Sequence, residues 1–181
     1  MENFDIIDQN GRPTDKIKSR EDAHRDGDWH RTVHVWIMNP KRKLLIQKRA
    51  SGLMAHPGMW HISVAGHIVA GDDSITTAVK ETAEELGINI EPQNLECLFT
   101  VKHQCVLNKG SYISNHLNDV YLVQLDLDIS KVRLQAEEVA EIKFVPFQEL
   151  EQLINQKKID MVEHDEEYEK LFQILHQRYG F

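Results

Sequence analysis

The pattern of hydrophobic and polar positions has the period of β-strands over most of the first half of the chain. Apolar and β-branched side chains dominate residues 32–38 and 43–47, on either side of Asn39-Pro40, which predicts a buried β-hairpin. A short strand over residues 4–7 runs into Asn-Gly and Pro13, which indicates an edge hairpin near the N-terminus. Further strands are expected over residues 59–65, 96–105, 119–127 and 141–145.

The period changes to that of a helix after Asp73. At about 100° per residue, one side of that helix collects Ile75, Ala78, Val79, Thr82 and Leu86. Gly87 supplies the left-handed residue that ends a helix. Two further amphipathic helices are expected over residues 148–154 and 166–178. Because no repeat or linker interrupts these elements, the pattern predicts a single α/β domain over residues 1–181 with C-terminal helices.

Three carboxylates share another sector of the first helix. Glu81 stands three and four residues before Glu84 and Glu85, and each like-charge contact at this spacing costs a few tenths of a kcal/mol. One interpretation is a solvated helix face. The other is a magnesium site, because Mg²⁺ binds through a few carboxylates, waters and substrate phosphate oxygens.

The segment from Gly66 to Ile88 resembles the Nudix box, which reads Gly, five residues, Glu, seven residues, Arg-Glu-aliphatic-x-Glu-Glu-x-Gly-aliphatic. All spacings agree, and six positions match: Gly66, Glu81, Glu84, Glu85, Gly87 and Ile88. Three positions depart from the pattern: Asp72, Lys80 and Thr82. The resemblance implies an α/β/α sandwich around a mixed β-sheet, and hydrolysis of a diphosphate linked to another group X.

The same resemblance implies the cofactor and the catalytic groups. Glu81, Glu84 and Glu85 would hold Mg²⁺ or Mn²⁺, joined by the backbone carbonyl of Gly66. Glu81 or Glu84 would accept the proton of the attacking water. Lys80 lacks the planar fork of an arginine and Asp72 is one methylene shorter than glutamate, so metal affinity or rate is expected to be lower than usual.

The segment between Asp28 and Asp72 contains no acidic residue and six cations. Three of them, Lys41 to Lys43, are interpreted as solubilising a hairpin tip. The other three, Arg31, Lys48 and Arg49, border strands that lead to the box and are candidates to bind substrate phosphates.

Residues 3–150 are similar to the branch of Nudix proteins that includes isopentenyl diphosphate isomerases, and residues 57–67 carry much of the likeness. In those isomerases three histidines and two glutamates bind one metal. His24, His30 and His67 fall near the histidine positions, whereas Ser114 and His116 stand in place of the glutamates. These histidines are therefore either metal ligands or filler, and His67 is also a candidate substrate contact.

Other side chains are less specific. Any of Glu137, Glu138 and Glu141 can be the downstream acid that Nudix proteins often use. Trp36 is interpreted as core, His103 as a surface residue and residues 163–167 as a solvated acidic face.

The amino-acid composition limits the classes of function that this protein can have. The chain is 41% hydrophobic and 28% charged, as expected of a protein with a real core, and its formal charge of −8 disfavours general nucleic-acid binding. Two cysteines without a CxxC motif support neither a disulfide framework nor a zinc knuckle. With no signal peptide or membrane span recognised, a cytoplasmic location is expected.

These observations predict a metal-dependent Nudix hydrolase acting on a small-molecule diphosphate, in which X is a nucleoside or another organic group. The alternatives are an isopentenyl diphosphate isomerase and a non-catalytic nucleotide-binding Nudix module. The oligomeric state is left open.

Overall fold

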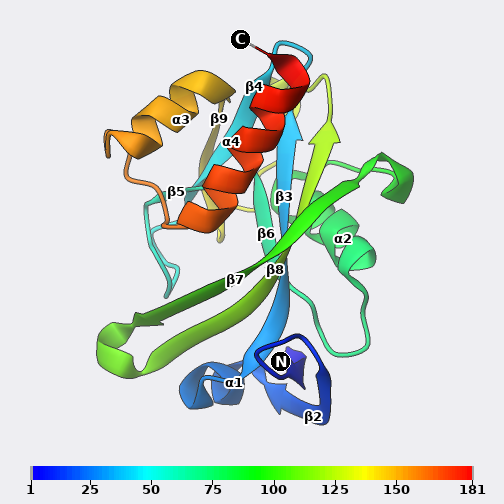
Figure 1. Ribbon diagram of the computed structural model, residues 1–181, viewed down its shortest axis with the longest axis vertical. Coiled ribbons are helices and arrows are strands. Elements are labelled where there is room, and N and C mark those ends of the chain that lie inside the picture. Colours follow the sequence, from blue (N-terminus) through cyan, green and yellow to red (C-terminus); the bar gives the residue numbers. More distant parts are fainter. Residues whose placement is uncertain (1, 181) are drawn as a thin grey trace.

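Nine strands form one mixed sheet in the computed structural model of the chain, which describes residues 2–180 (Figure 1). The strands are β1 (Asn3–Ile7), β2 (Pro13–Ser19), β3 (Trp29–Met38), β4 (Lys43–Arg49), β5 (Trp60–His61), β6 (Val64–His67), β7 (Glu96–Leu107), β8 (Tyr112–Gln124) and β9 (Val139–Pro146). The helices are α1 (Arg20–Asp26), α2 (Ser74–Leu86), α3 (Phe147–Asn155) and α4 (Asp165–Tyr179). Short 3-10 turns occupy Pro92–Asn94, Asn108–Gly110 and Ile129–Lys131.

Strand β3 is the centre of the sheet. It pairs in parallel with β8 along its whole length and antiparallel with β6. Its pairing with β4 is confined to Met38 and Leu44, beside the turn. The expected hairpin therefore closes only at its tip, because β6 takes the place beside β3 that a regular hairpin would give to β4. Alternation marks which face of a strand is buried but does not specify its partner.

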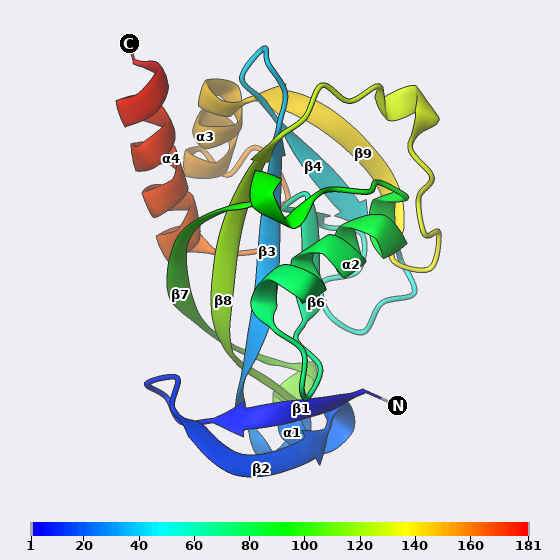
Figure 2. The ribbon, with the colours of Figure 1, turned by 90° about the vertical axis from the view of Figure 1, so that its right-hand side faces the viewer.

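Helices cover both faces of the sheet, with α2 on one side and α3 and α4 on the other (Figure 2). Trp36 and Met38 of β3 pack in the cluster that includes α3 and α4. Val33 and Val35, which point the other way, pack in the cluster that includes α2. Because the end of β3 is buried on both faces, its residues 35–38 form a continuous apolar run. The α/β/α sandwich expected from the resemblance is confirmed.

Helix α2 begins and ends where its sequence predicts. Asp73 caps the first turn by accepting a hydrogen bond from the Thr76 amide at 2.8 Å, and Gly87 ends the helix in the left-handed conformation at φ 65°. The expected apolar stripe is wrong at one edge, because Ile75 is 41% exposed while Glu85 is 1% exposed. The buried side of the helix therefore includes Glu85, whose carboxyl group accepts a hydrogen bond from Gln47 within the core.

The N-terminal elements form a small unit at one end of the sheet. The predicted edge hairpin is confirmed as β1 and β2. Helix α1 was not predicted, since seven residues are too short to show a periodic pattern, yet Ser19 caps it and Gly27 ends it at φ 71°. Strand β8 starts at Tyr112, seven residues before the expected start, because polar residues over 114–119 conceal the pattern.

The C-terminal helices are confirmed as α3 and α4. No helix within residues 2–180 is long and apolar enough to cross a membrane.

Candidate active site

One cavity of about 450 Å³ collects several of the polar side chains that the sequence singles out, among them Glu81, Glu84 and Arg49. Its walls come from the Gly66 strand β6, from helix α2, from the 52–56 loop, from β7 and β8, and from the segment that immediately precedes α4. This volume is typical of a small-molecule site.

The Glu81 side chain lies directly across Gly66. A methyl group on Gly66 would stand 2.3 Å from Cγ and Cδ of Glu81 and 2.6 Å from its Oε1. Burial, followed by the charges of Glu84 and Glu138, raises the pKa of Glu81 to about 7. A carboxyl group of this pKa can exchange a proton near neutral pH.

The other two box glutamates differ in their surroundings. Glu84 is exposed and lines the cavity together with Glu138, whereas Glu137 and Glu141 are not part of the cavity lining. Glu85 lies behind the cavity wall, where its Oε2 accepts a 2.7 Å hydrogen bond from Gln47, and burial raises its pKa well above the usual value. The three box carboxylates therefore do not form one compact group in the structure.

The three candidate phosphate-binding cations lie in three different places. Arg49 lines the cavity, with its Nε donating to the carbonyl of Ala55 at 3.0 Å. Arg31 lies on the α2 side of β3, where it forms a two-pronged ion pair with Asp119. Lys48 lies over the ring of Trp60 and is not part of the cavity lining. Of the three, only Arg49 is placed beside the box carboxylates.

Arg20 is a cavity cation that the sequence did not single out. It follows β2 and donates to Glu2 at 2.7 Å. Its position depends on the N-terminal hairpin folding back against the sheet, for which the sequence around Arg20 carries no signal.

Four histidines form a compact set beside the box: His24, His30, His67 and His116. Their ligand atoms all lie within 4.8 Å of one another, and His67 and His116 open onto the cavity. His30 contacts the carbonyl of Asp28 through Nδ1 at 3.0 Å, which leaves Nε2 as its lone-pair atom when Nδ1 carries the proton. The buried Nε2 atoms of His30, His67 and His116 have no hydrogen-bond partner. This four-histidine set therefore has the chemistry of a metal site.

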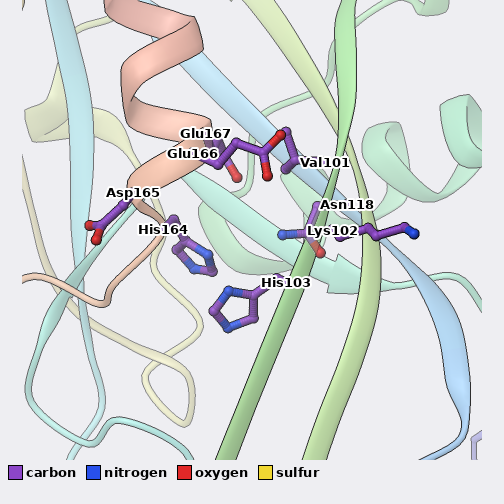
Figure 3. Close-up of a pocket in the computed structure, with 8 residues that line it drawn as sticks. All are labelled: Val101, Lys102, His103, Asn118, His164, Asp165, Glu166 and Glu167. Atoms are coloured by element: carbon purple, nitrogen blue, oxygen red, sulfur yellow. The ribbon is translucent and has the colours of Figure 1, made fainter. Parts of the chain in front are cut away.

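Three more histidines form a second set: His34, His61 and His164. They also line the cavity, and His164 and His103 are shared with a smaller adjoining pocket, where their rings face each other (Figure 3). His103 was expected on the surface, but the centroid of its ring lies 4.5 Å from that of His164, with the two rings tilted by 52°, and burial lowers its pKa to about 4. Because β7 is largely exposed on one side, its sequence gives no sign that the ring of His103 is shielded from solvent.

The acidic run over 163–167 is not wholly a solvated face. Glu167 is 1% exposed and accepts hydrogen bonds from His34 Nδ1 at 2.6 Å and Trp36 Nε1 at 2.9 Å. The carboxylate of Glu167 can be buried because two side chains of β3 donate hydrogen bonds to it. No local pattern in residues 163–167 predicts these partners.

Comparisons with known proteins agree with this arrangement. The family profile described as the NUDIX domain matches residues 28–168. Nudix hydrolase 3 of Arabidopsis thaliana is 41% identical over 182 aligned residues, covering 98% of this chain and 24% of that protein. An isopentenyl-diphosphate Delta-isomerase of Pectobacterium atrosepticum is 27% identical, over 81% of this chain and 78% of that enzyme.

A solved structure shares the fold. The NUDIX domain of Shewanella oneidensis NrtR, complexed with ADP ribose, superposes with a TM-score of 0.58 at 17% identity, covering 80% of this chain and 87% of that one. The chain spans about a quarter of the length of the Arabidopsis protein.

The sandwich and its glutamate-bearing helix on a polar cavity define a protein of the Nudix fold class. With the profile match covering more than half its length, the chain belongs to the Nudix hydrolase family. Its likeness to the branch that contains isopentenyl diphosphate isomerases is also confirmed, at lower identity.

Proposed function

We propose that this chain is a metal-dependent hydrolase that cleaves the diphosphate linkage of a nucleoside or other organic diphosphate. The observation that supports this proposal most strongly is the placement of Glu81 across Gly66, on the same cavity as Glu84 and Arg49. These residues bring together carboxylates and a cation where a diphosphate can enter.

A divalent metal fits the carboxylate end of the cavity. Nudix hydrolases generally use divalent metal ions, and the carboxylate and carbonyl oxygens offered here are the donors that Mg²⁺ and Mn²⁺ prefer. Burial, followed by the charges of Glu84 and Glu138, raises the pKa of Glu81, and a bound cation would favour the charged form of this carboxyl group. Glu81, Glu84 and the carbonyl of Gly66 would hold the ion from the cavity side, and Glu85 would join them by exchanging its hydrogen bond from Gln47 for the metal. When bound, it would neutralise charge on the bridging and leaving phosphate oxygens.

The remaining chemistry belongs to side chains of the cavity. We assign to Glu81 the role of general base, accepting the proton of the water that attacks phosphorus, with Glu84 as the alternative base. Arg49 would bind the outer phosphate oxygens by charge-assisted hydrogen bonds. His67 would contact the substrate beside the box. Attack forms one P–O bond and breaks the anhydride P–O bond, and the leaving phosphate carries away the electron pair.

The experiment is an assay of phosphate release over a panel of nucleoside and organic diphosphates. Activity should vanish with chelator and return with Mg²⁺ or Mn²⁺. Glu84→Gln should lower kcat by at least about a hundredfold without unfolding the protein, because Glu84 is exposed. Glu169→Gln, an exposed glutamate of α4, is the matched control and should keep wild-type kcat. Binding without turnover of any diphosphate would instead favour the non-catalytic nucleotide-binding module.

The second candidate is an isopentenyl diphosphate isomerase, and the four-histidine set is the observation that favours it. That reaction needs an acid and a base on opposite sides of the carbon framework. Ala65 and His116 stand where the isomerases have the cysteine and the glutamate. The nearest downstream acid, Asp119, is held by Arg31 and by Thr100 at 2.7 Å.

We therefore expect no isomerisation. Incubating the protein with isopentenyl diphosphate and metal, then separating the products, tests this expectation. Accumulation of dimethylallyl diphosphate at about 1 s⁻¹ or faster would overturn the hydrolase proposal.

We further propose that residues 1–181 act as a single Nudix domain in the cytoplasm. The two cysteines, Cys97 and Cys105, are unpaired, as is usual in a reducing compartment. Cell fractionation with a compartment-specific thiol label tests the location.

A further inference from the structure

The three-histidine set joins parts of the chain that are distant in sequence. His34 belongs to β3, His61 to β5, and His164 immediately precedes α4. Their side chains are 4%, 5% and 8% exposed, so the sheet and helix α4 hold the rings against the cavity wall. One ligand atom from each lies within 4.8 Å of the other two. None of the three belongs to the Nudix box or to the four-histidine set.

The spacing between two of these rings is close to that of two ligands of one metal ion. Nε2 of His61 and Nε2 of His164 are 3.0 Å apart. Two imidazole nitrogens at about 2.0–2.1 Å from one tetrahedral ion are separated by about 3.3–3.4 Å. The two rings would need to separate by only about 0.3–0.4 Å to share an ion.

The third ring is oriented by a carboxylate. Nδ1 of His34 donates to Oε2 of Glu167 at 2.6 Å, so the lone pair of the neutral ring resides on Nε2. The other oxygen of Glu167 accepts from Trp36 at 2.9 Å, which fixes the carboxylate in turn. A carboxylate that holds one ring nitrogen of a histidine while the other binds metal is the usual support of a protein metal site.

The charge state of the set suits ligation. Burial, followed by the neighbouring charged groups, lowers the pKa of His61 and of His164 well below the usual value for histidine. Both rings are therefore neutral near pH 7, and neutral imidazole is the form that binds metal.

We propose that His34, His61 and His164 bind a transition-metal ion of the zinc class, with a further coordination position facing the cavity. Three neutral imidazoles suit zinc and similar ions, whereas carboxylate and carbonyl oxygens suit magnesium and manganese. The chain thus carries a nitrogen-lined metal site that is chemically distinct from the oxygen-lined site of the box. Glu167 is its positioning residue.

A metal-free arrangement makes a different prediction. In that case Nε2 of one of His61 and His164 carries a proton and donates it to Nε2 of the other, at the same 3.0 Å. Such a hydrogen bond stabilises the neutral rings but confers no affinity for zinc. Metal content and metal position separate the two arrangements, and neither depends on the hydrolase activity.

The experiment locates zinc directly. The full chain is stripped with chelator, reloaded with Zn²⁺ and crystallised, and anomalous diffraction is recorded at the zinc absorption edge. We expect a peak bounded by His34, His61 and His164. Zinc affinity is measured in parallel by competition with a chromophoric chelator, in a His30→Gln background that weakens the four-histidine set.

Three variants sharpen the affinity measurement. His164→Gln should weaken zinc binding by at least about a hundredfold, and Glu167→Gln by about 10- to 100-fold. His103→Gln is the matched control, because the ring of His103 contacts that of His164 but is outside the three-histidine set, and it should keep zinc affinity within twofold. Co²⁺ substituted for zinc should show a visible spectrum that Glu167→Gln alters.

The proposal is overturned if the wild-type crystal shows no zinc at the three rings, or if folded His164→Gln keeps the zinc affinity of its His30→Gln parent. Circular dichroism melting establishes that each variant is folded. Should His164→Gln fail to fold, the anomalous peak in the wild-type crystal still decides between the two arrangements.

Discussion

Replacing Gly66 by alanine should separate catalysis from folding. The added methyl group would stand 2.3 Å from Cγ and Cδ of Glu81, whereas ordinary contact begins near 3.4 Å. Glu81 must therefore retreat by about 1 Å. A misplacement of about 1 Å in a reacting group can lower the rate by about a hundredfold. We expect Gly66→Ala to reduce kcat by about that factor.

The same substitution should hardly affect stability. The clash is with a flexible side chain, and the backbone of Gly66 is not in the left-handed region, so alanine fits its conformation. The reduced entropy of the unfolded chain contributes about 0.4–1 kcal/mol in favour of folding, which offsets part of the strain. Thermal melting followed by circular dichroism should show a midpoint close to that of the wild type.

Gly52→Ala is the matched control for this prediction. Gly52 also lines the cavity, but a methyl group there would meet nothing within 4 Å. It should leave kcat unchanged in the metal-dependent phosphate-release assay. A Gly66→Ala protein with kcat within twofold of the wild type would refute the placement of Glu81 as a reacting group.

Two further predictions concern charge. Arg49→Ala should raise KM about 5- to 150-fold, because about 1–3 kcal/mol of charge-assisted hydrogen bonding to phosphate is lost. Lys41→Ala at the hairpin tip should leave KM unchanged in the same steady-state assay, and equal effects of the two would contradict the assignment. The hydrogen bond from Arg178 lowers the pKa of Glu96, so this pair stabilises the fold above pH 4.5 and loses its effect as pH falls through the lowered pKa. Since both side chains are partly exposed, Glu96→Gln should cost at most about 1 kcal/mol at pH 7, or about 2–4 °C in Tm, and a Tm difference that persists at pH 2 would contradict this origin.

Local signals predicted the elements that carry the chemistry. Helix α2 was predictable because Asp73 and Gly87 mark its two ends and its period is regular. The box spacing then placed Glu81 and Glu84 on the side of the helix that faces the cavity. These inferences rest on residues within one segment, so no knowledge of the tertiary structure was needed.

Features that depend on distant partners could not be predicted in this way. Glu167 and Glu85 are buried because Trp36 and Gln47, on other strands, donate hydrogen bonds to them. Arg31 is bound by Asp119 on β8 rather than by substrate-facing groups of the cavity. The sequence shows the charge of each side chain but not the partner that the sheet places beside it.

The extended conformation of β3 sets the distance between the backbone positions of His30 and His34, which belong to different histidine sets. His30 and His34 lie four residues apart on the same face of this strand, so their backbone positions are separated by about 13 Å. The two histidine sets are therefore attached at well-separated points along one strand, and a molecule that contacts both extends along it. A shift of β3 by one residue would turn both histidines to the opposite face, so the register of a single strand controls both sets at once.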